Sequence, residues 1–301
     1  MTEKMYGSGE MVTVEGMVFE KACATARFFY LEHGYCHFRG KSLAYAKMLD
    51  ECFDYYNENA NRSSHESAFR NSDGVPRHII DIFRDSESPA LRLYRSEYFY
   101  SLIECLYPSG ECLTFTHSKL SFKEPGAVVD WFPHQDNGYK KLADRRVGFA
   151  VFVCLEDMNS GNGCLEVFPG SHKFGTQPHE RIVEDEETGD NQLRISSIPN
   201  GLAPFSVEAA KGDVIVFSAD TIHQSGSSSS GSRRLAIIAE VEAYRRFRLD
   251  DYGKPPLTVR GLYGRIDATV MSLCSLLSPY AIWRFIKKNR HLALLIRKIR
   301  Y

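Results

Sequence analysis

The stretch VGFAVFVCL, residues 147 to 155, is a continuous run of apolar residues, and a run this short predicts a strand buried inside a sheet. Turns rich in Gly, Pro and Asn, such as NSGNG and FPGSH, separate further segments with strand patterning. The pattern predicts a mainly β fold, either a sandwich or a barrel, flanked by helices. The other predicted strands lie at 112–122, 164–168, 211–217 and 233–241.

Helical patterning is confined mostly to the first third of the chain. Residues 17–33 and 41–57 show helical spacing of apolar residues, with a short strand expected at 35–38 between them. One or two further helices are expected within 86–107, and the polar segment 57–74 is expected to be a surface loop. These helices are interpreted as a scaffold for the β core.

Composition excludes several classes of protein. A chain of 301 residues with 43% hydrophobic and 25% charged residues can bury a large core as one domain or two, and we favour one. A net charge of -1 gives no sign of nucleic-acid binding, and the first residues show no secretory signal, so residence in the cytoplasm is expected. Eight cysteines occur without a CxxC pair, so we expect buried free thiols rather than disulfides or a zinc site.

Three residues suggest a metal site. His134 and Asp136 are one residue apart at a strand end, so both side chains project from one face, although this pair alone also fits an ordinary polar loop. His223 follows another strand 89 residues later. Two imidazoles and one carboxylate leave three adjacent positions open on an octahedral ion, as in non-haem Fe(II) oxygenases. Structural zinc more often has four protein ligands.

Such an iron centre needs two further electrons to split dioxygen, and a 2-oxoacid supplies them by decarboxylation. The site should therefore contain a cation for the distal carboxylate of the 2-oxoacid. Arginine suits this role because its planar fork donates two charge-assisted hydrogen bonds. Arg233 and Arg234 follow His223 by ten and eleven residues, and strand alternation lets only one of them point inward.

The residues around these positions resemble the phytanoyl-CoA dioxygenase family of Fe(II)/2-oxoglutarate-dependent oxygenases. Members of that family fold as a double-stranded β-helix, a cupin-like jelly roll. The resemblance covers about residues 111–243, with looser similarity in the N-terminal helices. It rests on HQDNGY (134–139), VGFAVFVCLED (147–157), NGCLEVFPGSHKFG (162–175), KGDVIVF (211–217), HQSG (223–226) and the arginine that follows.

The patterns along the chain predict one catalytic domain overall, with an N-terminal helical scaffold packed on the core (1–110), a jelly-roll catalytic core (111–245) and a basic amphipathic tail (246–301).

The resemblance also implies roles for individual residues. His134, Asp136 and His223 are similar to the iron ligands of the family. Ser225 and Arg234, two and eleven residues after the distal histidine, match the residues that bind the carboxylate of 2-oxoglutarate. Fe(II), 2-oxoglutarate and O2 are therefore the expected cofactor and co-substrates.

Several residues concern the rest of the pocket. Phe152 stands where relatives can carry a tryptophan beside the co-substrate, which makes this contact purely apolar. Lys140 and Lys141 replace the usual aromatic-proline pair, a departure on the substrate side. Tyr139 is a candidate to line the substrate pocket, although core packing also fits an aromatic residue at a strand end. Lys123 is a candidate contact for an acidic substrate, although an exposed turn lysine is the commoner outcome.

Four neighbouring residues have structural interpretations. His172 in FPGSH is expected to be a turn residue held by hydrogen bonds rather than a ligand. Trp131 and Phe132 are expected to pack beneath the iron ligands. Gln135 should point away from the metal because strand alternation opposes it to its neighbours.

The C-terminal tail has a distinct composition. From Ala268 to Tyr301 it contains no Asp or Glu but seven Lys or Arg residues, interleaved with large apolar residues. A cationic amphipathic helix of this kind is typical of the membrane interface, and its apolar runs are too short to span a bilayer. Residues 278–301 are therefore a candidate for peripheral attachment to the cytoplasmic face of a membrane. A packing helix or a dimer contact is the alternative, and the oligomeric state is left open.

The expected function is a dioxygenase that hydroxylates an unactivated C–H bond and releases succinate and carbon dioxide. Family members that halogenate replace the carboxylate ligand with a small residue, so Asp136 favours hydroxylation, with desaturation or ring formation as related outcomes. The tail favours a lipid or lipid-linked substrate, and a soluble natural product is the alternative. A different class is a cupin-like protein that binds metal without turnover.

Overall fold

The computed structural model describes most of the chain up to residue 244. The tail 246–301, including the candidate membrane segment 278–301, lies outside the described residues apart from 257–258. None of the described helices is long and apolar enough to cross a bilayer. The described residues are 19–39, 43–59, 68–70, 76–84, 88–107, 112–126, 131–140, 148–185, 190–244 and 257–258.

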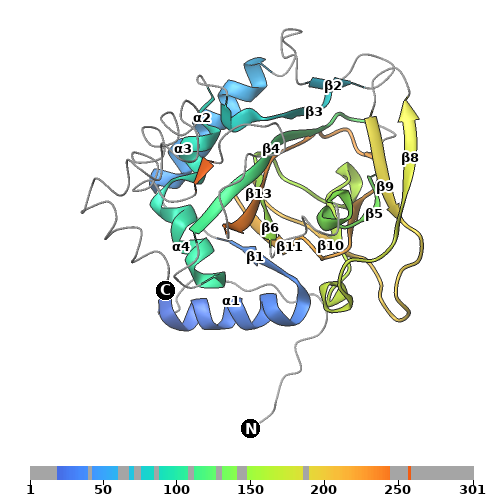
Figure 1. Cartoon of the computed structure of the whole chain (residues 1–301). Helices are drawn as coiled ribbons and strands as arrows, with labels where there is room; N and C mark the ends of the chain where they lie inside the picture. The colour runs from blue at the N-terminus through green and yellow to red at the C-terminus, as the bar shows by residue number, and fades with distance from the viewer. Residues whose placement is uncertain are drawn as a thin grey trace, which may run out of the picture.

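Two antiparallel sheets form the core (Figure 1). The larger sheet runs in the order β1 (Tyr35–Phe38), β11 (Val214–Ser218), β6 (Gly148–Cys154), β13 (Arg234–Tyr244), β4 (Cys112–Lys123), β3 (Pro76–Ile80) and β2 (Ala68–Arg70), with β14 (Leu257–Thr258) paired to β4. The smaller sheet runs in the order β10 (Phe205–Val207), β7 (Leu165–Val167), β12 (His223–Ser225) and β5 (Trp131–His134). A separate hairpin consists of β8 (His179–Asp185) and β9 (Asp190–Ile195). The fold is thus mainly β, as the sequence predicted.

The helices gather on one side of the molecule, and the β8–β9 hairpin lies on the other (Figure 1). They are α1 (Phe19–His33), α2 (Leu43–Asn59), α3 (Ala90–Tyr94) and α4 (Glu97–Leu106). Single turns of 3-10 helix connect other elements: η1 (Ile82–Arg84), η2 (Asp136–Tyr139), η4 (Ser160–Asn162) and η5 (Ser171–Phe174).

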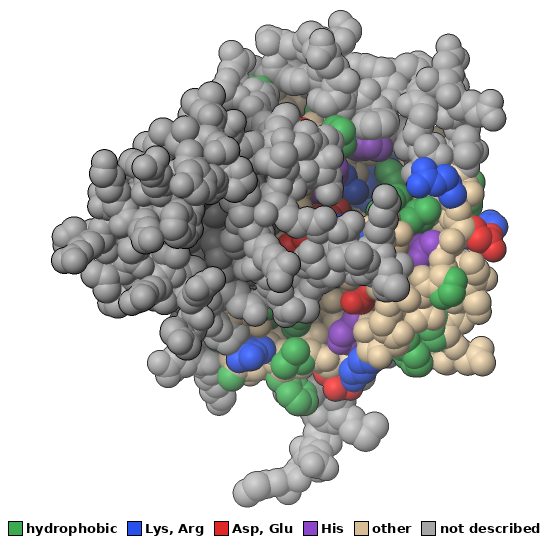
Figure 2. All heavy atoms as spheres, viewed as in Figure 1, with side chains coloured by type: hydrophobic (Ala, Val, Ile, Leu, Met, Phe, Trp, Pro, Cys, Tyr) green, Lys and Arg blue, Asp and Glu red, His purple; other side chains and the backbone are tan. Residues whose placement is uncertain are grey.

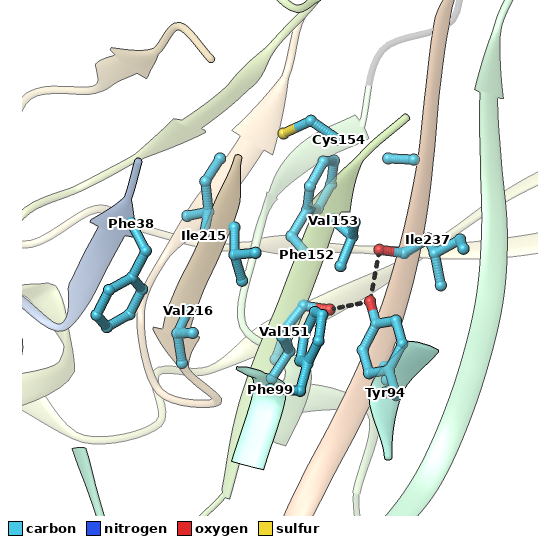
Figure 3. Packing of buried hydrophobic residues seen from close by; sticks show 14 of the residues in the cluster. Phe38, Tyr94, Phe99, Val151, Phe152, Val153, Cys154, Ile215, Val216 and Ile237 are labelled. Carbon is cyan, nitrogen blue, oxygen red and sulfur yellow. Dashed lines mark hydrogen bonds between the residues drawn. The ribbon is translucent and has the colours of Figure 1, made fainter. Parts of the chain in front are cut away.

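The outer face of the larger sheet packs against these helices. The hydroxyl of Tyr94 in α3 lies 2.9 Å from the carbonyl oxygens of both Val151 and Ile237, which belong to adjacent strands (Figure 3). Tyr107, just after α4, stacks on Phe149 with ring centroids 4.4 Å apart. Alternation along β6 and β13 therefore sends one set of side chains into the helical layer and leaves the other set for the interior between the sheets.

The structure corrects two expectations. Part of the predicted loop 57–74 forms β2, because Phe69 pairs with His78 in the adjacent β3. The expectation of free thiols was wrong for Cys23 and Cys105, which form a disulfide between α1 and α4 with Cα atoms 4.7 Å apart. The two cysteines are 82 residues apart in sequence, so their proximity depends on helix packing that composition does not indicate. Cys36, Cys52, Cys154 and Cys164 are free and buried, as expected.

Candidate metal centre and co-substrate site

The three expected ligands converge where β5, η2 and β12 meet. His134 ends β5, Asp136 begins η2, and His223 begins β12. Strands β5 and β12 pair so that the two histidines are direct partners, with ring centroids 4.2 Å apart. His223 Nε2 is 3.7 Å from Asp136 Oδ1. One ligand atom from each residue lies within 4.8 Å of the others, and all three side chains are buried.

Backbone carbonyl groups orient the two imidazoles. His134 Nδ1 lies 2.7 Å from the carbonyl oxygen of Phe132, and His223 Nδ1 lies 3.0 Å from that of Thr221. A carbonyl oxygen only accepts hydrogen bonds, so each Nδ1 must carry the proton. Each Nε2 is then left with a lone pair for a metal ion.

The electrostatics of this cluster fit a divalent cation. Burial raises the pKa of Asp136 and lowers the pKa of His134, so both groups lose their charged form more readily than in water. A bound cation would favour the ionised form of the Asp136 carboxylate and the neutral form of the two imidazoles. Within the described residues no fourth His, Cys, Asp or Glu joins the cluster, which leaves coordination positions open.

Gln135 points away from this cluster, as alternation predicted, and bridges two segments beside it. Its side-chain nitrogen donates to the carbonyl oxygens of Gly175 at 3.0 Å and Asp220 at 2.6 Å. Its side-chain oxygen accepts from the backbone nitrogen of Gln177 at 2.7 Å, and its own backbone nitrogen donates to His179 Nε2 at 3.1 Å. The corner between β5 and η2 is thereby tied to the segment that leads into β12.

Arg234 points into the interior between the sheets. It is 2% exposed, and it donates from Nη1 to the carbonyl oxygen of Gly163 at 2.7 Å and from Nη2 to Ser121 Oγ at 3.0 Å. Its Nε has no partner, and among the described residues no carboxylate pairs with it. Burial lowers the pKa of Arg234 to about 10, so it remains charged at neutral pH. A buried guanidinium without a counter-ion is costly unless an anion binds beside it.

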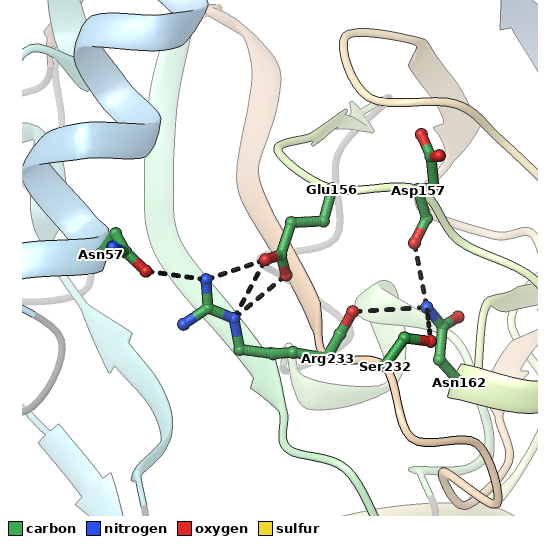
Figure 4. A network of polar contacts seen from close by, with 6 residues as sticks. All are labelled: Asn57, Glu156, Asp157, Asn162, Ser232 and Arg233. Atoms are coloured by element: carbon green, nitrogen blue, oxygen red, sulfur yellow. Dashed lines mark hydrogen bonds and ion pairs between the residues drawn. The ribbon is translucent and has the colours of Figure 1, made fainter.

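Arg233 faces outward and is already paired (Figure 4). Its Nη2 lies 2.8 Å from Glu156 Oε1 and 3.0 Å from Asn57 Oδ1. The hydrogen bond with Glu156 raises the pKa of Arg233. The two neighbouring arginines therefore differ in surroundings as strand alternation requires, one neutralised at the surface and one buried without an anion.

Ser225 lies on β12 and is supported by a buried lysine. Lys123 is 2% exposed, and its Nζ donates to Ser225 Oγ at 3.0 Å, to Ser225 O at 3.2 Å and to Gly226 O. Gly163 fits against this group, since a Cβ there would lie 2.3 Å from Gly226 O and 2.9 Å from Lys123 Nζ. Lys123 is thus not an exposed turn residue: it supports Ser225 from within the protein and is not among the residues that line the cavity described below.

A cavity of about 500 Å³, which includes space open to solvent, lies between the two sheets. On the described part of the face in Figure 2, acidic, basic and histidine side chains lie among hydrophobic ones. Tyr139 does not line the cavity: it is 47% exposed, and its hydroxyl accepts from the backbone nitrogen of Leu193 at 3.2 Å. The residues predicted to bind the metal or the co-substrate all line it: His134, Asp136, Phe152, His223, Ser225 and Arg234.

Two further placements concern residues near the cluster. His172 lies outside it and donates from Nε2 to the carbonyl oxygen of Leu31 at 3.0 Å, as expected for a turn residue. The Trp131 ring lies beside the cluster with its centroid 6.3 Å from that of His134, and it also lines the cavity.

Sequence reasoning missed Lys119, Ser121 and Glu240, which also line the cavity. A signal was present, because residues 112–122 alternate between polar and apolar side chains. The apolar side of β4, including Leu120, is buried in the hydrophobic core, so the polar side faces the cavity rather than bulk solvent. Alternation alone does not reveal that both faces of the sheet are covered.

Comparison with known proteins agrees with this geometry. Residues 30–236 match the sequence model of the family described as phytanoyl-CoA dioxygenase (PhyH). Phytanoyl-CoA dioxygenase 1 of Oryza sativa subsp. japonica is 36% identical over 121 residues, which are 40% of this chain and 41% of the relative. The matched region thus spans about two fifths of the length of such curated relatives.

Solved structures share the fold. EctD from S. alaskensis, in a crystal structure with 2-oxoglutarate and 5-hydroxyectoine, has a TM-score of 0.59 at 16% identity and covers 74% of this chain and 77% of its own. SnoN, a non-heme alpha ketoglutarate dependent epimerase from nogalamycin biosynthesis, has a TM-score of 0.57 at 21% identity and covers 74% of this chain and 84% of its own. The cupin-like jelly roll predicted from the sequence is confirmed.

Proposed function

The chain belongs to the phytanoyl-CoA dioxygenase family, and we propose on this basis that it is an Fe(II)/2-oxoglutarate-dependent dioxygenase that acts as a hydroxylase. One atom of O2 enters the substrate as a hydroxyl group, and the other enters succinate, which forms with carbon dioxide from 2-oxoglutarate. One observation carries the proposal. One cavity contains both an open cluster of two imidazoles and a carboxylate and a buried arginine that has no carboxylate partner among the described residues.

The first part of the proposal assigns the metal ligands. His134 and His223 would hold Fe(II) through their Nε2 atoms, and Asp136 would hold it through its carboxylate. When Fe(II) is bound, it would supply the oxidising power needed to attack an unactivated C–H bond, in combination with 2-oxoglutarate and O2. Gln135 contributes by tying the loop that carries Asp136 to the segment before β12.

The second part assigns the co-substrate site. Arg234 offers its charge to the distal carboxylate of 2-oxoglutarate. Ser225 can donate its own hydroxyl proton to the same carboxylate, because its Oγ already accepts from Lys123. Phe152, whose ring centre lies 6.0 Å from the guanidinium carbon of Arg234, provides an apolar wall that excludes water beside the co-substrate.

Retention of the carboxylate ligand supports hydroxylation of the substrate. Asp136 occupies the position where a halogenating enzyme would need space for chloride, so halogenation is disfavoured, while desaturation is a related outcome of the same oxidation.

The nature of the cavity wall bears on the substrate. Lys119 and Glu240 place charged groups in the lining, which disfavours a bare acyl chain in this part of the cavity. A polar reacting group, as in a lipid-borne sugar or a soluble natural product, meets this requirement. The basic segment 278–301 supports the lipid-linked form of this substrate.

The proposal is tested by O2-dependent formation of succinate from 2-oxoglutarate in the presence of Fe(II). The wild-type protein should form succinate, and the Asp136→Ala variant should not. A wild-type protein that forms no more succinate than this variant would instead support a cupin-like protein that binds metal without turnover.

A further inference from the structure

Lys119 is a cavity-lining lysine on β4 whose ammonium group forms no direct ion pair with any described residue, although its charge favours the ionised forms of Glu240 and Asp136 in the same lining. Its Nζ lies 5.4 Å from the centre of the Trp131 ring, a distance at which a cation is attracted to the face of an indole. Within the described part of the chain, no hydrogen bond or ion pair reaches this Nζ. The ammonium group is therefore available to a ligand in the cavity.

The acidic residues of the lining are already engaged. Glu240 lies 3.5 Å from Lys140 Nζ, and Lys140 also pairs with Glu242. Asp136, the other acidic residue of the lining, belongs to the candidate metal cluster. The single ammonium group of Lys140 thus serves two carboxylates, and neither Glu240 nor Asp136 forms a direct ion pair with Lys119.

Lys119 also stands apart from the candidate co-substrate site. Along the β4–β13 ladder Lys119 pairs with Ile238, whereas Lys123 pairs with Arg234. The step of four residues between these rungs separates the two backbone positions by roughly 13 Å along a strand, and the guanidinium of Arg234 reaches as far as Ser121, two residues before Lys123. The two carboxyl carbons of a five-carbon diacid are only about 5 Å apart. Arg234 and Ser225 both lie beside Gly163 and Lys123, so a molecule of 2-oxoglutarate that they held would lie toward the Lys123 rung and leave the Lys119 rung for a second anion.

From this placement we propose that Lys119, stacked on Trp131, is the substrate subsite for an anionic oxygen group, either a carboxylate or a phosphate. This group anchors one end of the substrate and leaves the reacting carbon to face the candidate metal ligands on the opposite wall. The inference rests on the proposed function, since it assigns the part of the cavity that the co-substrate does not use. The substrate class is then an acidic molecule rather than a neutral one.

The test measures anion binding to the Mn(II)-loaded protein saturated with 2-oxoglutarate in the absence of O2. Inorganic phosphate and acetate are the probes, and the Tm of the complex is the readout, because a ligand that binds the folded state raises it. We expect at least one probe to raise the Tm of the wild-type complex with a saturable dependence on concentration. Lys119→Met should weaken this response about tenfold or more, the effect expected for the loss of a charge-assisted contact.

Two variants control for charge and fold. Lys119→Arg keeps the positive charge and should retain the response to the probe. Lys173→Met removes a surface lysine that pairs with Glu32 and should behave as the wild type. If Lys119→Met does not fold, Lys119→Gln keeps a polar side chain of similar length and replaces it.

The outcomes separate the inference from the proposed function. A response to phosphate alone assigns a phosphate group, a response to acetate alone assigns a carboxylate, and either response must be lost in Lys119→Met. An unchanged response in that variant, or no response of the wild type to either probe, overturns the inference. Equal weakening of 2-oxoglutarate binding in Lys119→Met also overturns it, since Lys119 would then belong to the co-substrate site. If 2-oxoglutarate does not raise the Tm of the wild-type Mn(II) protein, the proposed function fails instead.

Discussion

Replacement of Arg234 by alanine should weaken the binding of 2-oxoglutarate by about tenfold to a hundredfold. The side chain is 2% exposed, lines the cavity and has no carboxylate partner among the described residues. Loss of a charge-assisted hydrogen bond costs roughly 1.5 to 3 kcal/mol, and each 1.4 kcal/mol corresponds to about a factor of ten in affinity. The variant loses the bonds to Gly163 and Ser121 but also removes a buried charge that lacks a counter-ion, so the two effects on the unfolding free energy oppose each other.

The assay is calorimetric titration of 2-oxoglutarate into Mn(II)-loaded protein without O2, combined with the KM for 2-oxoglutarate from succinate formation in air. Arg233→Ala is the matched control, because it removes the same charge from the adjacent residue on the opposite face. Its pair with Glu156 is partly exposed and contributes on the order of 1 kcal/mol to stability. The affinity of this control for 2-oxoglutarate should stay near that of the wild type.

If Arg233→Ala weakened 2-oxoglutarate binding more than Arg234→Ala did, the assignment of Arg234 as the inward arginine would be refuted. An Arg234→Ala protein that is folded and binds 2-oxoglutarate like the wild type would remove this arginine from the co-substrate site altogether.

Four further predictions follow from the sequence and the structure. Asp136→Ala should abolish succinate formation without lowering the Tm of the metal-free protein, because burial already raises the pKa of this carboxyl group. If the variant kept most of its turnover, Asp136 would not be a metal ligand. Gly163→Ala should lower the unfolding free energy in urea by roughly 1 to 3 kcal/mol, since φ is 69° and the new Cβ would lie 2.3 Å from Gly226 O. At Gly201 φ is 84° but no atom lies within 4 Å of an added Cβ, so Gly201→Ala should lower the unfolding free energy by less than Gly163→Ala does. Equal losses of unfolding free energy in the two variants would rule out a clash between the new Cβ and Gly226 O. Burial lowers the pKa of His117 and His134 below 6.5, so the unfolded chain binds more protons and the unfolding free energy should fall as the pH drops through 6.5. Urea denaturation on both sides of that pH measures this, and a pH dependence unchanged in His117→Gln would exclude a contribution from His117. Truncation after Leu277 should release the protein from anionic vesicles while 2-oxoglutarate turnover persists, and a full-length protein that ignores such vesicles at low ionic strength would contradict the membrane prediction.

The longer elements could be predicted because their patterns are local. The helix expected at 17–33 is α1, and the apolar run at 147–155 contains β6. The three residues of β12 carry too little alternation to be recognised as a strand, and β12 exists because it pairs with the distant segments β5 and β7. The β8–β9 hairpin was missed for a related reason, since its polar residues resemble those of a loop.

The metal cluster could be predicted from residue type and order, whereas the substrate side could not. His134 and His223 each follow or end a strand pattern, and this placed them at strand ends. The inward direction of Lys119 and Glu240 depends on which face of the larger sheet the helices cover. That choice is made by tertiary packing, and it is not present in the alternation of a single strand.

The pairing of His134 with His223 has a consequence for the synthesis of the protein. The two residues are 89 positions apart, so a ribosome that adds 5 to 20 residues per second makes the second histidine roughly 4 to 18 s after the first. During that interval the nascent chain carries one imidazole and one carboxylate with no partner strand to align them. Metal capture must therefore wait until β12 has been translated and has paired with β5, which makes loading a late event in the biogenesis of this protein.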